Sequence, residues 1–196
     1  MRLTPRTWLQ LFLIGGVAGA LYDQIHVQGH VLAYPRHDFL QQSWWVAPNF
    51  GLASVMIALT GGWLARWASR MHMGAPDKSN QTHNRELLGH FAWFTLAYLA
   101  SAFLPLQQPM LLALFVATWL GRVLPRRDRM PQLVQGLSLA VAGTTFETVL
   151  SSTGAFTYLR PDLVYVPSWL PGLYLHGAPL ALALLVRVQP PEMNKP

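Results

Sequence analysis

Long apolar stretches run through this chain, and short polar segments separate them. Most of the stretches approach the roughly 20 residues that an α-helix needs to cross the hydrocarbon core of a bilayer. The pattern predicts an all-α integral membrane protein: a bundle of six transmembrane helices that forms a single membrane domain over residues 1–196. The predicted spans cover residues 7–25, 44–65, 87–106, 109–124, 132–152 and 169–188.

The composition supports a membrane protein. Hydrophobic residues make up 52% of the chain and charged residues only 11%, whereas a soluble domain has about 25% charged residues. The chain contains no cysteine, which excludes disulfides and thiolate metal sites. No cleavable signal peptide is expected, because the first apolar run lacks a small-residue cleavage site and continues into Asp23 and His26.

The lysines and arginines predict the orientation of the spans. Such residues collect on the cytoplasmic side of membrane proteins, and six spans with a cytoplasmic N-terminus place 12 of the 14 on that side. Arg36 and Arg160 are the two on the outer side. Both termini are therefore expected in the cytoplasm, and the net charge of +6 indicates topology and not nucleic-acid binding.

Two segments of the chain resemble each other at an offset of 124 positions. Residues 17–45 and 141–169 share seven identities in 29 positions, and Asp23 is matched by the acid Glu147. We interpret the match as a duplicated helical hairpin, which pairs spans one and two with spans five and six. In membrane bundles, binding sites tend to lie at the interface between such repeats. The identical pairs are Val17/Val141, Ala18/Ala142, Gly19/Gly143, Tyr34/Tyr158, Arg36/Arg160, Asp38/Asp162 and Trp45/Trp169.

Three motifs of the sequence point to a known family. The most specific is Tyr158-Leu-Arg-Pro-Asp-Leu-Val-Tyr-Val-Pro-Ser-Trp-Leu-Pro171. It resembles the segment Tyr-x-x-Pro-Asp-Phe-Leu-Tyr-Val-Arg-Ser-Trp-Leu-Pro of the Insig family, the small six-span sterol-responsive proteins of the animal endoplasmic reticulum. Ser43-Trp44-Trp45-Val46-x-Pro48 resembles the start of the family's second span, and Arg126-Arg127-Asp128-Arg129 resembles its basic turn. The resemblance implies a bundle with a lipid pocket that opens to the membrane. It also implies oxysterol-like ligands and helix contacts with other membrane proteins.

An acid inside a membrane span is costly unless it is paired, hydrated or protonated, so it marks a functional position by default. We expect Glu147 to face a cavity and to hydrogen-bond a ligand hydroxyl or an inward histidine; the alternative is a structural hydrogen bond to Thr or Ser of another helix. The predicted ligand-binding residues are Asp23, His26, Thr144, Glu147, Thr148, Ser151 and His176.

The histidines allow a second interpretation. Asp23, His26 and His30 share one helical face if the first span continues, and His90 or His176 could add ligands for a metal or haem. An interfacial cluster that ordinary hydrogen bonds tie to the connecting segment is the alternative. We predict no metal and no cofactor.

The sequence thus predicts an Insig-like protein that binds a small-headed lipid, such as a sterol or diacylglycerol, in an intramembrane cavity. Small residues in spans one and five are expected to let a neighbouring helix come close: Gly15, Gly16, Gly19 and Ala20, and Gly136, Ala140, Ala142 and Gly143. Small-residue helix faces are also expected to allow contacts with the protein itself or with another membrane protein. The alternatives are a lipid- or isoprenoid-modifying enzyme that uses Asp23, Glu147 and histidines, and a small transporter. No catalytic motif is present, so an enzyme is less expected. The short termini indicate a bacterial inner-membrane protein; a eukaryotic one would lie in the endoplasmic reticulum.

Overall fold

The computed structural model describes residues 4–70 and 80–188, which form six helices and one short two-stranded sheet. Each predicted span corresponds to one helix, and most ends agree within about five residues. The largest difference is at the third span, where the helix starts at residue 80 and includes polar residues before the apolar stretch. The elements are α1 (Pro5–Gln28), β1 (Leu32–Ala33), α2 (Val46–Arg70), α3 (Asn80–Phe103), α4 (Gln108–Val123), α5 (Arg129–Ser152), β2 (Thr157–Tyr158) and α6 (Leu170–Val188).

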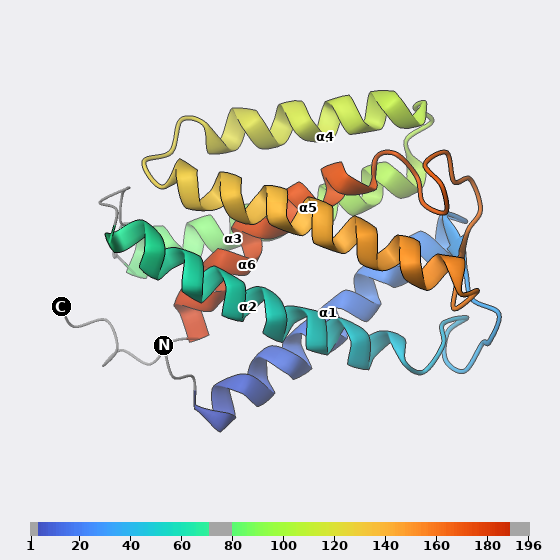
Figure 1. The fold of residues 1–196 in the computed structure, drawn as a ribbon, viewed down its shortest axis with the longest axis horizontal. Helices are drawn as coiled ribbons and strands as arrows, with labels where there is room; N and C mark the ends of the chain where they lie inside the picture. The colour runs from blue at the N-terminus through green and yellow to red at the C-terminus, as the bar shows by residue number, and fades with distance from the viewer. Residues whose placement is uncertain (1–3, 71–79, 189–196) are drawn as a thin grey trace.

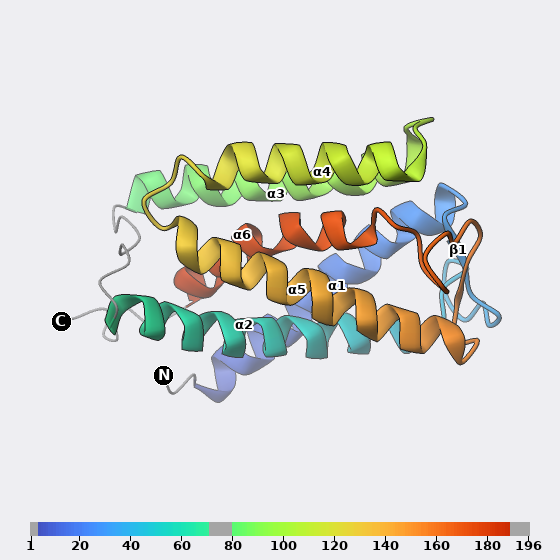
Figure 2. The ribbon, with the colours of Figure 1, turned by 45° about the horizontal axis from the view of Figure 1, so that its top comes forward.

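Helix α6 lies in the middle of the bundle. It packs against α5, α3, α4 and α2, while α1 packs mainly against α2. Figure 2 shows α3 and α4 on one side, α1 and α2 on the opposite side, and α5 and α6 between them. Two connecting segments, residues 29–45 and 153–169, lie together at one end of the bundle. We call them the first and second elbow, and their end of the bundle the elbow end (Figure 1).

The two elbows are joined by the antiparallel pairing of β1 with β2. Ala33 pairs with Thr157, its own counterpart at the offset of 124. The neighbouring pair, Leu32 with Tyr158, fits the same register. A two-fold axis that passes between Ala33 and Thr157 would exchange the two hairpins, so the sequence repeat has a structural counterpart.

The turns inside the elbows repeat as well. The Asp38 carboxylate accepts a hydrogen bond from the Trp44 backbone N–H at 3.1 Å, and Asp162 accepts one from the Ser168 N–H at 2.6 Å. Both hydrogen bonds connect positions that correspond at the offset of 124. Phe39 bridges to Gln42, and Leu163 bridges to Val166 in the same way. The duplicated hairpin therefore keeps its turn geometry where most of its residues have diverged.

The small residues of α1 and α5 allow close contact with neighbouring helices of the same bundle. A Cβ at Gly16 would lie 2.8 Å from the Ala47 carbonyl oxygen of α2, and a Cβ at Gly19 would clash with the Phe50 ring. A Cβ at Gly143 would clash with the Tyr174 ring of α6. The prediction that these small residues let a neighbouring helix come close is therefore confirmed for Gly16, Gly19 and Gly143.

In the described part of the chain, two helices are long and apolar enough to cross a membrane on length and composition alone: Val46–Leu64 and Arg129–Ser152. Two others, Gln108–Val123 and Leu170–Leu184, are apolar but shorter. Many large apolar side chains are exposed on the outside of the bundle, including Val17, Leu52 and Val141 at 60–69% exposure. An apolar outer surface of this kind is typical of a protein that faces lipid.

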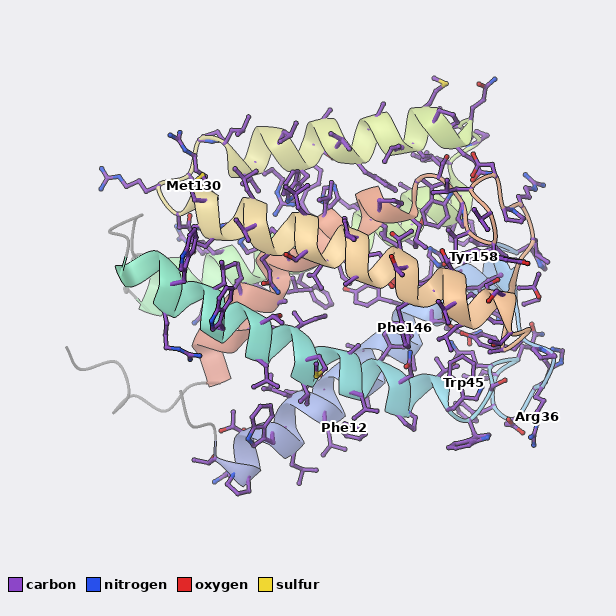
Figure 3. The ribbon with its side chains drawn as sticks, in the orientation of Figure 1. Phe12, Arg36, Trp45, Met130, Phe146 and Tyr158 are labelled. Carbon is purple, nitrogen blue, oxygen red and sulfur yellow. The ribbon has the colours of Figure 1, made fainter. Side chains whose placement is uncertain are left out.

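The arginines separate by end of the bundle. Most of them lie close to helix ends at the end of the bundle opposite the elbows, whereas Arg36 and Arg160 lie in the elbows. Figure 3 shows Arg36, Trp45 and Tyr158 at the elbow end and Met130 at the other end. Arg2, Lys78 and Lys195 of the predicted cytoplasmic set lie outside the described residues. The described arginines of the predicted cytoplasmic set are Arg6, Arg66, Arg70, Arg85, Arg122, Arg126, Arg127, Arg129 and Arg187, at one end, and Arg36 and Arg160 lie at the other.

Candidate functional site

Asp23 lies near the end of α1 with its carboxylate turned into the bundle, where it is only 5% exposed. Its Oδ2 accepts a hydrogen bond from the Tyr34 hydroxyl at 2.8 Å and another from Gln42 Nε2 at 2.7 Å. Gln42 Nε2 also donates to the Ala20 carbonyl at 3.0 Å. The first elbow thus folds back over α1 and satisfies the buried acid.

Glu147 occupies the corresponding position on α5. Its two carboxylate oxygens accept hydrogen bonds from the Tyr158 and Tyr174 hydroxyls. Tyr158 is the counterpart of Tyr34, so each acid is bound by the same tyrosine of its own elbow. Phe156 lies between the two tyrosine rings, with centroids 5.9 Å from Tyr34 and 5.5 Å from Tyr158. The two acids therefore belong to one symmetric aromatic cluster at the elbow end.

Sequence reasoning placed both acids inside the bundle but did not identify their partners. Within residues 4–70 and 80–188, Glu147 is bound by two tyrosines and by no histidine, Thr or Ser side chain. The repeat could have identified the tyrosine partners, because Tyr34 and Tyr158 are an identical pair that follows each acid by eleven positions.

Asp23 and His26 share one face of α1, but His30 does not continue it. Helix α1 ends at Gln28, and His30 follows as an exposed residue with φ of 52°. His26 is buried against Tyr98 at 4.6 Å between ring centroids and shares a 2.8 Å hydrogen bond with Ser101. Among the described residues no group of three or more His, Asp or Glu side chains is placed to hold a metal ion. The hydrogen bonds of Asp23 to Tyr34 and Gln42 of the first elbow fit the alternative interpretation, a cluster that ordinary hydrogen bonds tie to the connecting segment.

Two of the predicted hydroxyl residues of α5, Thr144 and Ser151, lie three residues before and four residues after Glu147 and so share its helix face. The Thr148 hydroxyl donates to the Thr144 carbonyl at 2.8 Å, and the Ser151 hydroxyl donates to the Tyr165 carbonyl at 3.2 Å. The Thr144 hydroxyl oxygen is buried and finds no hydrogen-bond partner in the described part of the chain. It is the predicted ligand residue of α5 whose side chain is left unsatisfied.

His176 lies apart from the acids, deeper along α6. Its ring contacts α4, where Nε2 lies 3.0 Å from the Phe115 carbonyl and Nδ1 lies 3.3 Å from Arg122 Nη1. The structure therefore does not bring His176 together with Asp23 and His26 in one site.

A groove of about 260 Å³ lies at the elbow end between α1 and α2, closed by the first elbow. Its walls are mostly apolar, and Gln24 and Gln42 bring amide groups to them. Gln24 Oε1 is buried and has no hydrogen-bond partner among residues 4–70 and 80–188. Gln42 connects the groove to Asp23, but none of the seven predicted ligand residues lines it. The lining residues are Val17, Ala20, Leu21, Gln24, Phe39, Leu40, Gln42, Ser43, Trp44, Val46 and Ala47.

The opposite end of the bundle carries an ionic cluster at the turn between α4 and α5. Arg126 binds Glu86 of α3 at 2.9 Å and Asp128 at 2.9 Å, and Gln132 donates to Asp128 at 2.9 Å. Burial alone would raise the pKa of Asp128, but the hydrogen bonds from Arg126 and Gln132 outweigh it and hold this pKa below its usual 3.8. The cluster fastens the turn to α3 while Asp128 is ionised.

Comparison with known proteins agrees with the fold and the motifs. No family model matches the chain. The human insulin-induced gene 1 protein is 26% identical over 185 residues, which cover 88% of this chain and 65% of that protein. The insulin-induced gene 2 protein of Gallus gallus is 27% identical over 171 residues, covering 85% of this chain and 73% of that protein. The chain thus spans about two thirds of the length of these relatives.

Two solved structures share the whole fold. The mycobacterial Insig homologue MvINS from Mycobacterium vanbaalenii superposes with a TM-score of 0.73 at 24% identity, covering 97% of this chain and 99% of that one. A cross-linked trimer of MvINS gives a TM-score of 0.74 at 23% identity, covering 100% and 99%. Fold and sequence define the class as a six-helix membrane protein built from two related hairpins. The resemblance to the Insig family is confirmed, and the protein is an Insig-like membrane protein.

Proposed function

We propose that the protein binds a lipid with a small, hydroxyl-bearing head in the groove between α1 and α2. The observation that carries this proposal is the buried Gln24 Oε1 without a partner in the described chain, in the wall of an apolar groove. An unsatisfied buried acceptor costs about 1–3 kcal/mol. A ligand hydroxyl that donates to Gln24 would remove this cost, as the head of a diacylglycerol or a sterol can do.

The size and position of the groove suit part of such a lipid. A volume of about 260 Å³ is slightly below the range of about 300–1,000 Å³ for pockets that bury a drug-sized molecule. The groove can therefore hold the head and the first carbons. Leu21 and Trp44, at 64% and 65% exposure, extend the apolar wall outward, where the tail of the lipid would continue into the bilayer.

Asp23 serves the proposed site through Gln42. Its carboxylate fixes the Gln42 amide at 2.7 Å, which sets the orientation of that side chain in the groove wall. Thr144, Glu147 and Thr148 remain predicted contacts on the α5 side, and the unsatisfied Thr144 hydroxyl supports this part of the prediction.

We infer that all six helices cross the membrane with the elbow end outside and both termini in the cytoplasm. The separation of the described arginines supports this orientation, and a bacterial inner membrane is the inferred location. Contacts with another copy or another membrane protein complete the proposal. The cross-linked MvINS trimer supports self-association.

The test compares lipid retention in variants of one helix. The full chain is purified in mild detergent, and its bound lipid is measured by native mass spectrometry and by extraction. Gln24→Leu should lose the lipid at least tenfold and should raise the melting temperature of the lipid-free protein, because it removes an unsatisfied amide. Gln28→Leu, an exposed position one turn later, should change neither. Equal retention in Gln24→Leu and wild type would contradict the proposal.

A further inference from the structure

Arg122 of α4 contacts side chains of two other helices, α3 and α6, at the end of the bundle opposite the elbows. Its Nη2 donates to His90 Nδ1 on α3 at 2.7 Å, and its Nη1 donates to His176 Nδ1 on α6 at 3.3 Å. The guanidinium carbon lies 5.0 Å from the centre of the Trp93 ring. A half-buried cation is thus placed by two imidazoles and an aromatic face.

The two imidazoles hold Arg122 without neutralising it. Each accepts a hydrogen bond at Nδ1 from a cation, so Nδ1 carries no proton, and the ring-nitrogen roles follow from these partners. His176 has its proton at Nε2, which lies 3.0 Å from the Phe115 carbonyl oxygen. The site therefore keeps the full positive charge of Arg122.

The acidic side chains near Arg122 form ion pairs with another arginine. Glu86 and Asp128 both pair with Arg126, and no ion pair to Arg122 forms within residues 4–70 and 80–188. A guanidinium has five N–H donors, and the described side chains and backbone accept two of them. Three donors therefore remain for a group from outside the described chain.

We propose that Arg122, positioned by His90, His176 and Trp93, binds the phosphate of a phosphomonoester or phosphodiester. A partly buried cation requires a counter-charge, and the planar fork of donors on Arg matches phosphate oxygens. Arg122 is the next-to-last residue of α4, at the depth where a span meets the headgroup layer. The phosphate can come from a phospholipid of that leaflet or from free phosphate.

This site is separate from the groove between α1 and α2. Its residues come from α3, α4 and α6, and it lies at the other end of the bundle. Failure of the lipid groove would therefore leave the phosphate site untouched, and the reverse also holds.

The experiment uses two lipids that differ only in the phosphate. Phosphatidic acid and diacylglycerol with the same acyl chains are titrated onto the full chain in detergent, and the dissociation constants are measured by native mass spectrometry. Phosphatidic acid should bind at least tenfold more tightly to the wild type than to Arg122→Gln. Arg127→Gln, which removes an exposed charge of the adjacent turn, should retain wild-type affinity.

A second variant, Arg122→Lys, tests the proposal if Arg122→Gln does not fold. Arg122→Lys keeps the charge but loses the fork, and it should weaken phosphatidic acid binding severalfold without affecting diacylglycerol. Displacement by millimolar inorganic phosphate would identify the free ion as a sufficient ligand, whereas its failure to compete would assign the lipid headgroup. Equal losses in Arg122→Gln and Arg127→Gln, or unchanged phosphatidic acid binding in Arg122→Gln, would overturn the proposal.

Discussion

Asp23 and Glu147 show how a buried acid is tolerated at a single position. Each carboxylate accepts two hydrogen bonds from side chains, and in each case one donor is the tyrosine eleven residues later in its own elbow. The symmetry indicates that the acid and the tyrosine form one structural unit, present twice. A ligand that approaches either acid would have to share it with these donors.

Removing one tyrosine hydroxyl should therefore destabilise the bundle. Tyr34→Phe and Tyr158→Phe each leave a carboxylate with one hydrogen bond fewer, at a cost of about 1–3 kcal/mol. Thermal unfolding in detergent should show lower melting temperatures for both variants. Tyr165→Phe, at an elbow position that is 49% exposed, provides the control and should behave as the wild type. Unchanged melting in both Tyr34→Phe and Tyr158→Phe would show that the acids do not depend on these hydroxyls.

The pKa of Asp128 predicts a pH dependence. Because the folded protein holds this pKa below the usual 3.8, the ionised group stabilises the fold above that pH. The contribution is lost as the pH falls from about 3.8 through the lower folded pKa. Melting temperatures of wild type and Asp128→Asn should therefore differ at pH 7 and converge below pH 4. A difference that stays constant with pH would exclude ionisation of Asp128 as its cause.

At the scale of elements, sequence pattern located every helix because apolar stretches of this length leave few alternatives. It could not show which helix each small-residue face contacts, since spacing along one helix does not identify the partner. Gly16 and Gly19 thus seat α2 of the same bundle and not a second molecule. The hydrophobic pattern also could not predict that α1 ends at Gln28. This helix end separates His30 from the face that Asp23 and His26 share.

The helix contacts predict opposite effects for two glycine substitutions. Gly19→Ala places a Cβ against the Phe50 ring, and overpacking of this kind costs about 1–3 kcal/mol. Gly121→Ala meets no atom within 4 Å in the described structure, and replacing a helical glycine by alanine there should stabilise by about 0.5–1 kcal/mol. Melting temperatures in detergent give the comparison. If both variants shifted in the same direction, the close packing of α1 on α2 would be in doubt.

At the scale of the whole molecule, the paired elbows and the distribution of arginines give the bundle two unlike ends. The groove lies at the elbow end and the Arg122 cluster at the other. In the inferred orientation, one ligand enters from the outer leaflet and the other from the inner leaflet.

The absence of cysteine from the chain makes this orientation directly testable. A single cysteine at the exposed His37 of the first elbow should react with a membrane-impermeant maleimide in intact cells. A cysteine in place of Arg127, at the opposite end, should react only after the cells are opened. The reverse labelling pattern would invert the topology.

The central claim is that a hydroxyl-bearing lipid occupies the groove between α1 and α2, and photo-crosslinking tests it most directly. A diacylglycerol with a diazirine near its glycerol is bound to the purified full chain and irradiated, and the modified residues are mapped by peptide mass spectrometry. The account predicts labels on groove residues such as Leu21, Phe39 or Trp44, and loss of these labels in Gln24→Leu but not in Gln28→Leu. Labels confined to α3 and α4, with none on the groove, would contradict it.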